Sequence, residues 1–317
     1  MYKAPFKRLQ MVALELPVMS WSLRCNRHRE SKYIMSDDQP NAEQKEYWDG
    51  HGGPVWVELQ ERLDAQIAPL GTVALDKAAA SPGESVLDVG CGCGQTTQAL
   101  AEQVGATGTV LGVDISGPML KRAADRNRDA HNVSFVHADA QTYQFDLEKA
   151  DLMFSRFGVM FFDDPTAAFS NIRRALKPGG RMCFVCWQNV EKNPWVTGPL
   201  RATAEHVPLP PPSPPGTPGP IAFADPLRLE TILTNAGFQQ FSCSSFESVM
   251  RMGANRGIEG AVDFLLRIGP VASLLREASP DSQKAAKNGI AKALVPFASG
   301  NHVDLDCATW IVNAVSS

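Results

Sequence analysis

The chain has 317 residues, of which 44% are hydrophobic and 20% are charged, a composition typical of a globular protein with one large or two modest domains. Its formal net charge of −4 argues against nucleic acid as a partner, and the lack of any apolar run of about 18 residues argues against a membrane span. The cysteines number 7, and an odd, scattered set argues against a secreted disulfide framework and favours the cytoplasm.

Residues 1–34 differ in composition from the rest of the chain. Their basic residues outnumber Glu15 and Glu30 by five, and Glu15 and Pro17 interrupt the apolar core that a signal peptide requires. We interpret this segment as an extension that is disordered or not translated, with Met35 as the start of the protein. An organellar transit peptide is the alternative. Residues 35–83 are expected to form an N-terminal helical lid segment.

From residue 84 onward, short apolar runs alternate with segments of helical periodicity. Strands are predicted at 85–89, 109–113, 133–136, 151–154 and 181–187. The most regular of the helices between them begins after Asp164, a residue suited to a helix cap, and ends at the Pro-Gly-Gly of 178–180. Alternating strands and helices predict a mostly parallel α/β sheet with helices on both faces, whose ligand lies beyond the carboxyl ends of the strands.

The pattern loosens after Trp187. Residues 208–220 are rich in proline and form a stiff connection, which we interpret as a loop over the mouth of the site; a docking motif for another domain is the alternative. Asp225 and Gly237 mark the two ends of a further helix. Strands are predicted at 241–250 and 303–315, with helix across 258–293. The segment 188–238 is therefore expected to be a substrate cap, and 239–317 to complete the sheet with inserted helices.

The most informative motif is VLDVGCGCG at residues 86–94, which leads into a predicted helix over 95–104. A strand that runs into glycines and then into a helix lets the backbone contact a ligand closely, because no side chain intervenes. Dinucleotide sites have glycine at the first, third and sixth positions of this turn. Counted from Gly90 the sixth position is Gln95, and counted from Gly92 it is Thr97, so neither register fits. A tight turn without a ligand is the structural alternative.

Glycine at the first, third and fifth positions resembles motif I of the class I S-adenosylmethionine-dependent methyltransferases. Four further segments resemble that family in the same order: Asp114 after the second strand, 137–140 after the third, 151–158 at the fourth, and 177–181 before the fifth. The resemblance implies a Rossmann-like, mostly parallel seven-stranded sheet with a helical and loop lid, and S-adenosylmethionine as cofactor. It covers residues 84–187, the expected cofactor-binding core. Within the class, the chain looks like the ubiquinone/menaquinone-type methyltransferases and their uncharacterised bacterial relatives.

The resemblance also implies roles for single residues. Asp88 helps to place the cofactor's ammonium group, directly or through water, and Asp139 contacts the adenine amino group. An acid at the tip of the second strand can accept hydrogen bonds from both ribose hydroxyls, which is the role expected of Asp114; opening the next helix is its alternative. The full set of expected cofactor-binding residues is Asp88, Gly90, Cys91, Gly92, Gly94, Asp114, Ile115, Met119, Asp139, Ala140 and Ser155.

No metal site is expected. Cys183 and Cys186 form a C-x-x-C, but an offset of three in a strand points their side chains to opposite faces, so we interpret them as packing residues. Cys91 and Cys93 lack the second pair that a zinc site needs. His137 is interpreted as a structural histidine at the rim of the sheet.

The expected function is methyl transfer to an oxygen, carbon or nitrogen of a small-molecule acceptor, by in-line displacement at the sulfonium methyl and with positioning as the main source of rate. A general base is not assigned, because no histidine follows the fourth strand. The conceivable bases are Tyr47, Asp49, His51 and His206. A planar or apolar acceptor is favoured by the aromatic residues Trp48, Trp56, Trp195 and Phe223.

Two other functions stay open at this point. One is an NAD(P)-dependent Rossmann oxidoreductase, since nicotinamide sites also place an acid such as Asp114 at the second strand. The other is a regulatory protein that binds S-adenosylmethionine without catalysis.

Overall fold

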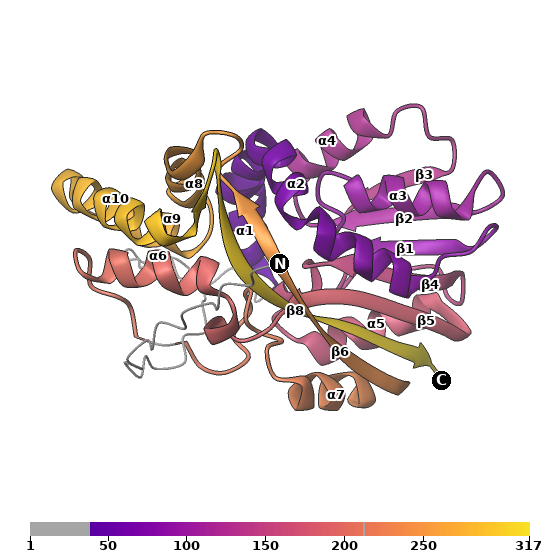
Figure 1. Cartoon of the computed structure of the whole chain (residues 1–317). Helices are drawn as coiled ribbons and strands as arrows, with labels where there is room; N and C mark the ends of the chain where they lie inside the picture. Colours follow the sequence, from indigo (N-terminus) through magenta and orange to yellow (C-terminus); the bar gives the residue numbers. More distant parts are fainter. Residues whose placement is uncertain (1–38, 212) are drawn as a thin grey trace, which may run out of the picture.

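The computed structural model describes residues 39–211 and 213–317, so the expectations for residues 1–34 and for Met35 lie outside the described part. Figure 1 shows a central sheet with helices on both faces and a cluster of helices at one end. The strands are β1 Ser85–Val89, β2 Thr109–Asp114, β3 Val133–His137, β4 Ala150–Arg156, β5 Leu176–Trp187, β6 Phe238–Met252, β7 Ala298–Ser299 and β8 His302–Ser316. The α-helices are α1 Ala42–Tyr47, α2 Gly53–Ala78, α3 Gln95–Val104, α4 Gly117–Arg126, α5 Pro165–Ala175, α6 Pro194–Ala204, α7 Pro226–Asn235, α8 Gly257–Leu265, α9 Pro270–Leu275 and α10 Pro280–Leu294.

The strands form one sheet in the order β3-β2-β1-β4-β5-β8-β6, and the short β7 pairs with β8 off this path. The first five strands of the path are parallel, whereas β8 is antiparallel to both β5 and β6. The mostly parallel α/β sheet is therefore confirmed. The main path contains the seven strands expected, and the two-residue β7 makes an eighth.

The predicted strands are present, and the largest boundary shifts are at the starts of β5 and β6, which begin five and three residues early. β5 begins at Leu176 rather than at residue 181, because Leu176 pairs with Ala150 across an irregularity in the register of β4 and β5. The two predicted helix caps, Asp164 and Asp225, are confirmed. The Asp164 carboxylate accepts a hydrogen bond from the Ala167 amide, and the Asp225 carboxylate accepts one from the Leu227 amide, each at 2.9 Å. Polar side chains of this type satisfy backbone amides that have no partner inside the helix.

The helical structure expected over 258–293 consists of three helices, α8, α9 and α10. Gly269, with φ of 81°, lies in a backbone region that favours glycine, and it separates α8 from α9. Pro270 and Pro280 begin the two later helices, where a residue without an N–H is tolerated and the preceding helix cannot continue through it.

The cap consists of α6, α8, α9 and α10, which pack against one another at the end of the molecule toward which the parallel strands point (Figure 1). The helices α8 to α10 are inserted between β6 and β8, and these two long strands run from the core of the sheet into the cap (Figure 1). Among the described residues, no helix combines the length and apolar character that crossing a bilayer would require.

Candidate active site

The turn after β1 exposes bare backbone. Gly90, Gly92 and Gly94 have φ of 67°, 56° and 77°, a region that other residues adopt only at a cost. At Gly90 the chain also lies against the loop after β4, since a Cβ added there would fall 2.6 Å from the Gly158 Cα. The Gly92 amide donates a hydrogen bond to Asp114 Oδ2 at 2.7 Å, which ties this turn to the end of β2.

Asp114 stands beside the glycine turn at the carboxyl end of β2. Its two oxygens accept hydrogen bonds from the amides of Gly92 and Ser116, at 2.7 and 2.9 Å. Burial raises the pKa of this carboxyl, and the two backbone hydrogen bonds partly oppose the rise. A carboxylate offers about four acceptor positions, so about two remain for the hydroxyls of a ligand. The cap of α4 is not Asp114 but Ser116, whose hydroxyl accepts a hydrogen bond from the Met119 amide.

Asp88 lies behind the turn and is 0% exposed. Its Oδ2 accepts hydrogen bonds from the hydroxyls of Thr96 and Thr97, at 2.8 and 2.7 Å, whereas Oδ1 has no partner among the described residues. Burial raises the pKa of this carboxyl to about 6, although the two threonine hydroxyls act in the opposite direction. A buried acceptor without a partner costs free energy, so Oδ1 has unused capacity to accept a donor from a ligand or a water.

A cavity of about 1850 Å³ opens at the carboxyl ends of the parallel strands. Its wall contains eight of the expected cofactor-binding residues, namely Gly90, Cys91, Gly92, Asp114, Ile115, Met119, Asp139 and Ala140. Three expected residues are not part of the wall. Asp88 is buried, Gly94 is the N-cap of α3, and the buried Ser155 hydroxyl accepts a hydrogen bond from the Gly158 amide at 3.2 Å.

Asp139 is held by the segment that leads into α1. Its Oδ2 accepts a hydrogen bond from the Asn41 side-chain amide at 2.8 Å, and its Oδ1 accepts one from the Gln141 amide at 2.8 Å. The Asn41 side-chain oxygen also accepts a hydrogen bond from the Asp163 amide at 2.7 Å. Asn41 therefore joins the loop after β3 to the loop before α5, and it closes this side of the cavity.

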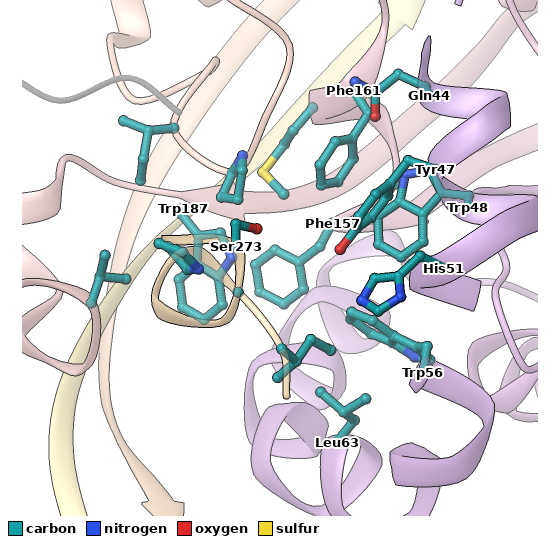
Figure 2. Close-up of a pocket in the computed structure, with 18 of the residues that line it drawn as sticks. Gln44, Tyr47, Trp48, His51, Trp56, Leu63, Phe157, Phe161, Trp187 and Ser273 are labelled. Atoms are coloured by element: carbon teal, nitrogen blue, oxygen red, sulfur yellow. The ribbon is translucent and has the colours of Figure 1, made fainter. Parts of the chain in front are cut away.

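Aromatic side chains line the part of the cavity that faces the cap. Phe157 and Trp187 are stacked, with ring centroids 4.4 Å apart, and Trp195 lies 4.9 Å from Trp187. Trp48 packs edge-on against both Trp56 and Phe161, at 5.8 and 5.4 Å. Figure 2 shows Trp187 and Trp48 on opposite sides of the pocket, with Phe157 between them. The expected residue Phe223 is not part of this wall, because it is buried against Phe169 and Phe184.

Comparison with known proteins relates this part of the chain to a protein family. Residues 86–180, from β1 to the start of β5, match the family described as a methyltransferase domain. This part of the chain is similar to methyltransferase domains. This match covers the glycine turn, Asp114 and the loop after β4.

Two curated relatives show how far the sequence similarity extends. A demethylmenaquinone methyltransferase of Staphylococcus saprophyticus is 39% identical over 98 residues, which are 31% of this chain and 42% of that protein. The aklanonic acid methyltransferase DauC of Streptomyces sp. strain C5 is 34% identical over 127 residues, 39% of this chain and 58% of that protein. The chain thus spans about half the length of the curated relatives it matches.

Solved structures resemble the chain over a larger part of its length. A proposed methyltransferase of Bacillus halodurans C-125 covers 77% of this chain and 97% of its own, with a TM-score of 0.51 and 17% identity. The YcgJ protein of Bacillus subtilis covers 78% of this chain and 98% of its own, with a TM-score of 0.51 and 14% identity. At these identities the similarity shows a shared fold.

A buried charged network that the sequence analysis missed joins β4 to α2 and α4. The Arg156 guanidinium, at the end of β4, donates hydrogen bonds to Gln95 Oε1 and, at 3.1 Å, to Asp64 Oδ1. Arg126 reaches the other Asp64 oxygen at 2.8 Å. Burial lowers the pKa of Arg156, and the neighbouring Asp64 carboxylate opposes this. Arg156 is a charged residue at the end of an apolar strand, and this pattern could have indicated a buried ion pair. Its partner Asp64, however, lies on α2, far away in sequence.

The residues considered as general bases separate into two groups. Tyr47, His51 and His206 line the cavity, whereas Asp49 does not. The Asp49 carboxylate instead accepts a hydrogen bond from the Gly117 amide at 2.7 Å. Tyr47, at the end of α1, and His51 have ring centroids 6.2 Å apart, and Figure 2 shows both rings at the edge of the same pocket.

Residues 48–52 form a π-helix, η1 Trp48–Gly52, between α1 and α2. The Trp48 carbonyl accepts a hydrogen bond from the Ser116 hydroxyl at 2.8 Å, and a Cβ on Gly53 would fall 2.1 Å from the same carbonyl oxygen. Wider helical turns of this kind often occur at functional sites. With the bond from Asp49, η1 is attached at two points to the loop that follows Asp114.

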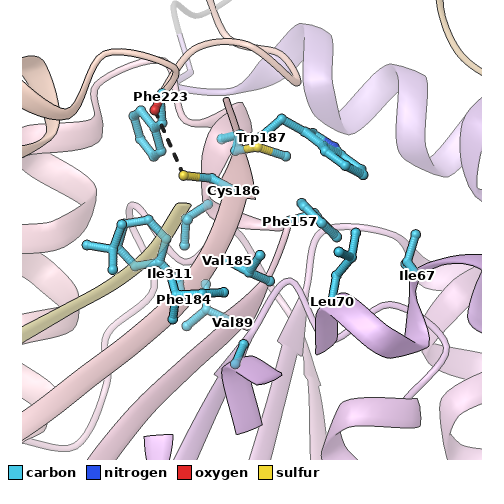
Figure 3. Close-up of a cluster of buried hydrophobic side chains, with 14 of the residues drawn as sticks. Ile67, Leu70, Val89, Phe157, Phe184, Val185, Cys186, Trp187, Phe223 and Ile311 are labelled. Atoms are coloured by element: carbon cyan, nitrogen blue, oxygen red, sulfur yellow. Dashed lines mark hydrogen bonds between the residues drawn. The ribbon is translucent and has the colours of Figure 1, made fainter. Parts of the chain in front are cut away.

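The C-x-x-C pair has the geometry predicted for it. The Cys183 thiol donates to the Ala74 carbonyl on one face of β5, and the Cys186 thiol donates to the Phe223 carbonyl on the other. Figure 3 shows Cys186 and Phe223 on the side of the strand away from Leu70 of α2. His137 lies at the rim with its Nε2 2.9 Å from the Ile115 carbonyl oxygen. Across residues 39–211 and 213–317, no group of three or more potential metal ligands comes together.

Proposed function

We propose that this protein transfers the methyl group of S-adenosylmethionine to a small-molecule acceptor. The observation that carries the proposal is the pairing of the glycine turn with Asp114 at the wall of one cavity. Small-molecule sites usually have volumes of about 300–1,000 Å³, so a cavity of about 1850 Å³ has room for a nucleoside cofactor and an acceptor together.

The residues present fit this cofactor. The unpartnered Asp88 Oδ1 can accept a donor from its ammonium group through a bridging water, and the free acceptor positions of Asp114 suit the two ribose hydroxyls. Asp139 and the Ala140 amide would hold the adenine edge. Ile115 and Met119 would pack against the same nucleoside, with the backbone of Gly90, Cys91 and Gly92 against its amino-acid end.

When bound, S-adenosylmethionine supplies a methyl group on a positively charged sulfur. The chain's own contribution is to orient the acceptor, to hold it in line with that methyl group and to keep water out. We propose that residues 188–238 and the inserted helices within 239–317 form the cover for this purpose. In support, Pro208, Leu209, Pro210 and Pro220 line the cavity, and the Gly219 amide donates to the Met160 carbonyl at 2.9 Å. We also propose a cytoplasmic location, which fits the odd number of cysteines.

Thermal unfolding in the presence of S-adenosylhomocysteine tests the cofactor. A ligand that binds only the folded state at a hundred times its Kd stabilises that state by about 2.7 kcal/mol. We expect a stabilisation of this size for the native protein and none with NADH. A response to NADH without one to S-adenosylhomocysteine would replace methyl transfer by the oxidoreductase alternative. Strong cofactor binding without methylation of any member of a broad acceptor panel would favour a regulatory role.

A further inference from the structure

The acceptor part of the cavity has two flat aromatic sides. One side is the stack of Phe157 and Trp187 with Trp195 beside it, and the other is Trp48 with its edge-on partners. Phe157 has φ of 62°, a conformation that is rare for a bulky residue. The strained backbone at Phe157 persists because the ring stacks on Trp187 and the Phe157 amide donates to the Val185 carbonyl at 3.0 Å. Such a slot suits a planar, apolar molecule.

One edge of this slot is polar. The Tyr47 hydroxyl and the His51 ring lie next to Phe157 (Figure 2), and Arg276, which follows α9, lines the same cavity. Nearby, Gln44 is 7% exposed, and its Oε1 has no hydrogen-bond partner within residues 39–211 and 213–317. No carboxylate of the described residues forms an ion pair with Arg276. The polar edge therefore combines a cation, a phenolic donor, an imidazole and an unused amide oxygen.

The electrostatic state of this edge follows from burial and from Arg276. Burial raises the pKa of Tyr47, which therefore remains a neutral donor. Partial burial, and then the positive charge of Arg276, lower the pKa of His51, so its imidazole is unprotonated at neutral pH. The other charged or titratable residues that line the cavity include Glu43, Glu46, His206 and Glu277.

From this arrangement, and resting on the proposed methyl transfer, we propose that the acceptor is a planar apolar molecule with an acidic oxygen at the site of methylation. Its anion lies beside Arg276, and His51 accepts its proton when that oxygen belongs to a hydroxyl. A carboxyl acceptor arrives already ionised and needs Arg276 alone. The shared chemistry is a flat ring system with an ionisable O–H group.

The proton step balances within these residues. The acceptor O–H bond breaks, its proton binds the unprotonated ring nitrogen of His51, and the electron pair stays on the oxygen. That oxygen forms the new bond to the methyl carbon while the bond from carbon to sulfur breaks, and the bonding pair leaves with the sulfur. His51 is exposed and returns the proton to solvent.

Equilibrium binding of matched probes to the full chain, saturated with S-adenosylhomocysteine, tests this inference. The probes are 2-naphthoate, its neutral counterpart 2-naphthamide, and 4-nitro-1-naphthol, whose phenolate absorbs visible light. In Arg276→Met we expect at least tenfold weaker binding of 2-naphthoate and less than a twofold change for 2-naphthamide. Arg267→Met is the matched control, because Arg267 is paired with Glu58 outside the cavity, and it should leave all three probes unaffected.

The visible absorbance of bound 4-nitro-1-naphthol reports on the base. We expect its apparent pKa in the complex to rise by at least one unit in His51→Gln and in Arg276→Met, but not in Arg267→Met. A response of the carboxylate probe alone identifies a carboxyl acceptor, and a response of the phenol alone identifies a hydroxyl acceptor. Equal binding of 2-naphthoate and 2-naphthamide, with no pKa change for the phenol, overturns the inference. Stabilisation by S-adenosylhomocysteine is measured in the same samples, so a failure of cofactor binding is distinguished from a failure of the acceptor proposal.

Discussion

Asp88 has the least favourable environment of the carboxylates around the glycine turn. Its pKa of about 6 lies above the ordinary value of 3.8, so between these two values the folded protein binds more protons than the unfolded chain. The free energy of unfolding contributed by Asp88 therefore falls as the pH rises from about 4 to about 6. A shift of about two units corresponds to a cost of about 3 kcal/mol at neutral pH.

Asp88→Asn removes this cost, because an amide carries no charge and its oxygen can still accept from Thr96 and Thr97. We expect the variant, without ligand, to be more stable than the native protein by up to about 3 kcal/mol at pH 7.5, and by only about 1 kcal/mol at pH 4.5. Urea unfolding at both pH values measures this. Carboxylates whose pKa values are lowered, such as Glu84 and Asp151, are common to both proteins and cancel in the comparison. An equal stability difference at the two pH values would refute the assigned cause.

Asp114 gives a second prediction for a single side chain. Asp114→Asn loses the charged acceptor that we propose for the ribose hydroxyls, and hydrogen bonds to charged groups contribute about 1.5–3 kcal/mol each. We expect the Kd for S-adenosylhomocysteine, measured by calorimetry, to rise roughly 10- to 150-fold. Asp146→Asn, which changes an exposed carboxylate outside the cavity, is the control and should keep the native Kd. An unchanged Kd in Asp114→Asn would show that Asp114 does not bind the ribose.

At the scale of elements, the π-helix η1 connects the acceptor slot to the cofactor turn. The Asp49 carboxylate accepts a hydrogen bond from the Gly117 amide, and the Ser116 hydroxyl donates one to the Trp48 carbonyl. The loop after Asp114 therefore fixes the position of the segment that contains Tyr47 and His51. In Asp49→Ala, loss of one hydrogen bond of about 1 kcal/mol should speed hydrogen exchange of residues 42–53 about fivefold. Asp49→Asn retains an acceptor oxygen and should exchange at the native rate. Equal exchange in the two variants would mean that η1 is held by other contacts.

Elements with a local signal could be predicted from the sequence. The buried strands up to β5, the caps Asp164 and Asp225 and the glycine turn each depend on residues within a few positions of one another. The π-helix could not be predicted, because its Trp48 carbonyl is satisfied by Ser116, a residue on another element. The division of 258–293 into three helices likewise has a local signal in Gly269 and in the prolines that begin α9 and α10.

The same distinction holds within the candidate site. Asp114 and the glycines lie at strand ends, where the topology of a parallel sheet determines their position. Arg156 and Asp64, by contrast, meet only after α2 packs across the sheet, and Arg276 reaches the cavity only through the cap. Contacts between elements that are distant in sequence produce no periodic pattern in the sequence. The residues on the acceptor side of the cavity could therefore be identified only from the structure.

At the scale of the whole molecule, core and cap share one continuous hydrophobic cluster. Leu70 of α2, Phe184 of β5 and Ile290 of α10 all belong to it and are buried. We therefore expect Ile290→Ala, a change in the cap, to destabilise the entire protein by about 2–5 kcal/mol in a single cooperative transition. Thermal unfolding followed by near-ultraviolet circular dichroism and by tryptophan fluorescence checks whether the two transitions coincide. An early, separate transition in the variant would show that the cap unfolds on its own.

The place where α8 to α10 join the sheet has a consequence for how acceptor choice changes among proteins of this architecture. Met252 at the end of β6 lies opposite Val303 at the start of β8, so the chain departs from the sheet and returns to it at adjacent points. The stretch between them, Arg276 included, can be lengthened, shortened or exchanged without changing the order of the seven strands in the main path of the sheet, because only the two-residue β7 lies within it. Under the acceptor proposal above, one contiguous stretch of gene then governs which acceptor the protein binds, and a graft of residues 253–302 between homologues is the engineering counterpart of that freedom.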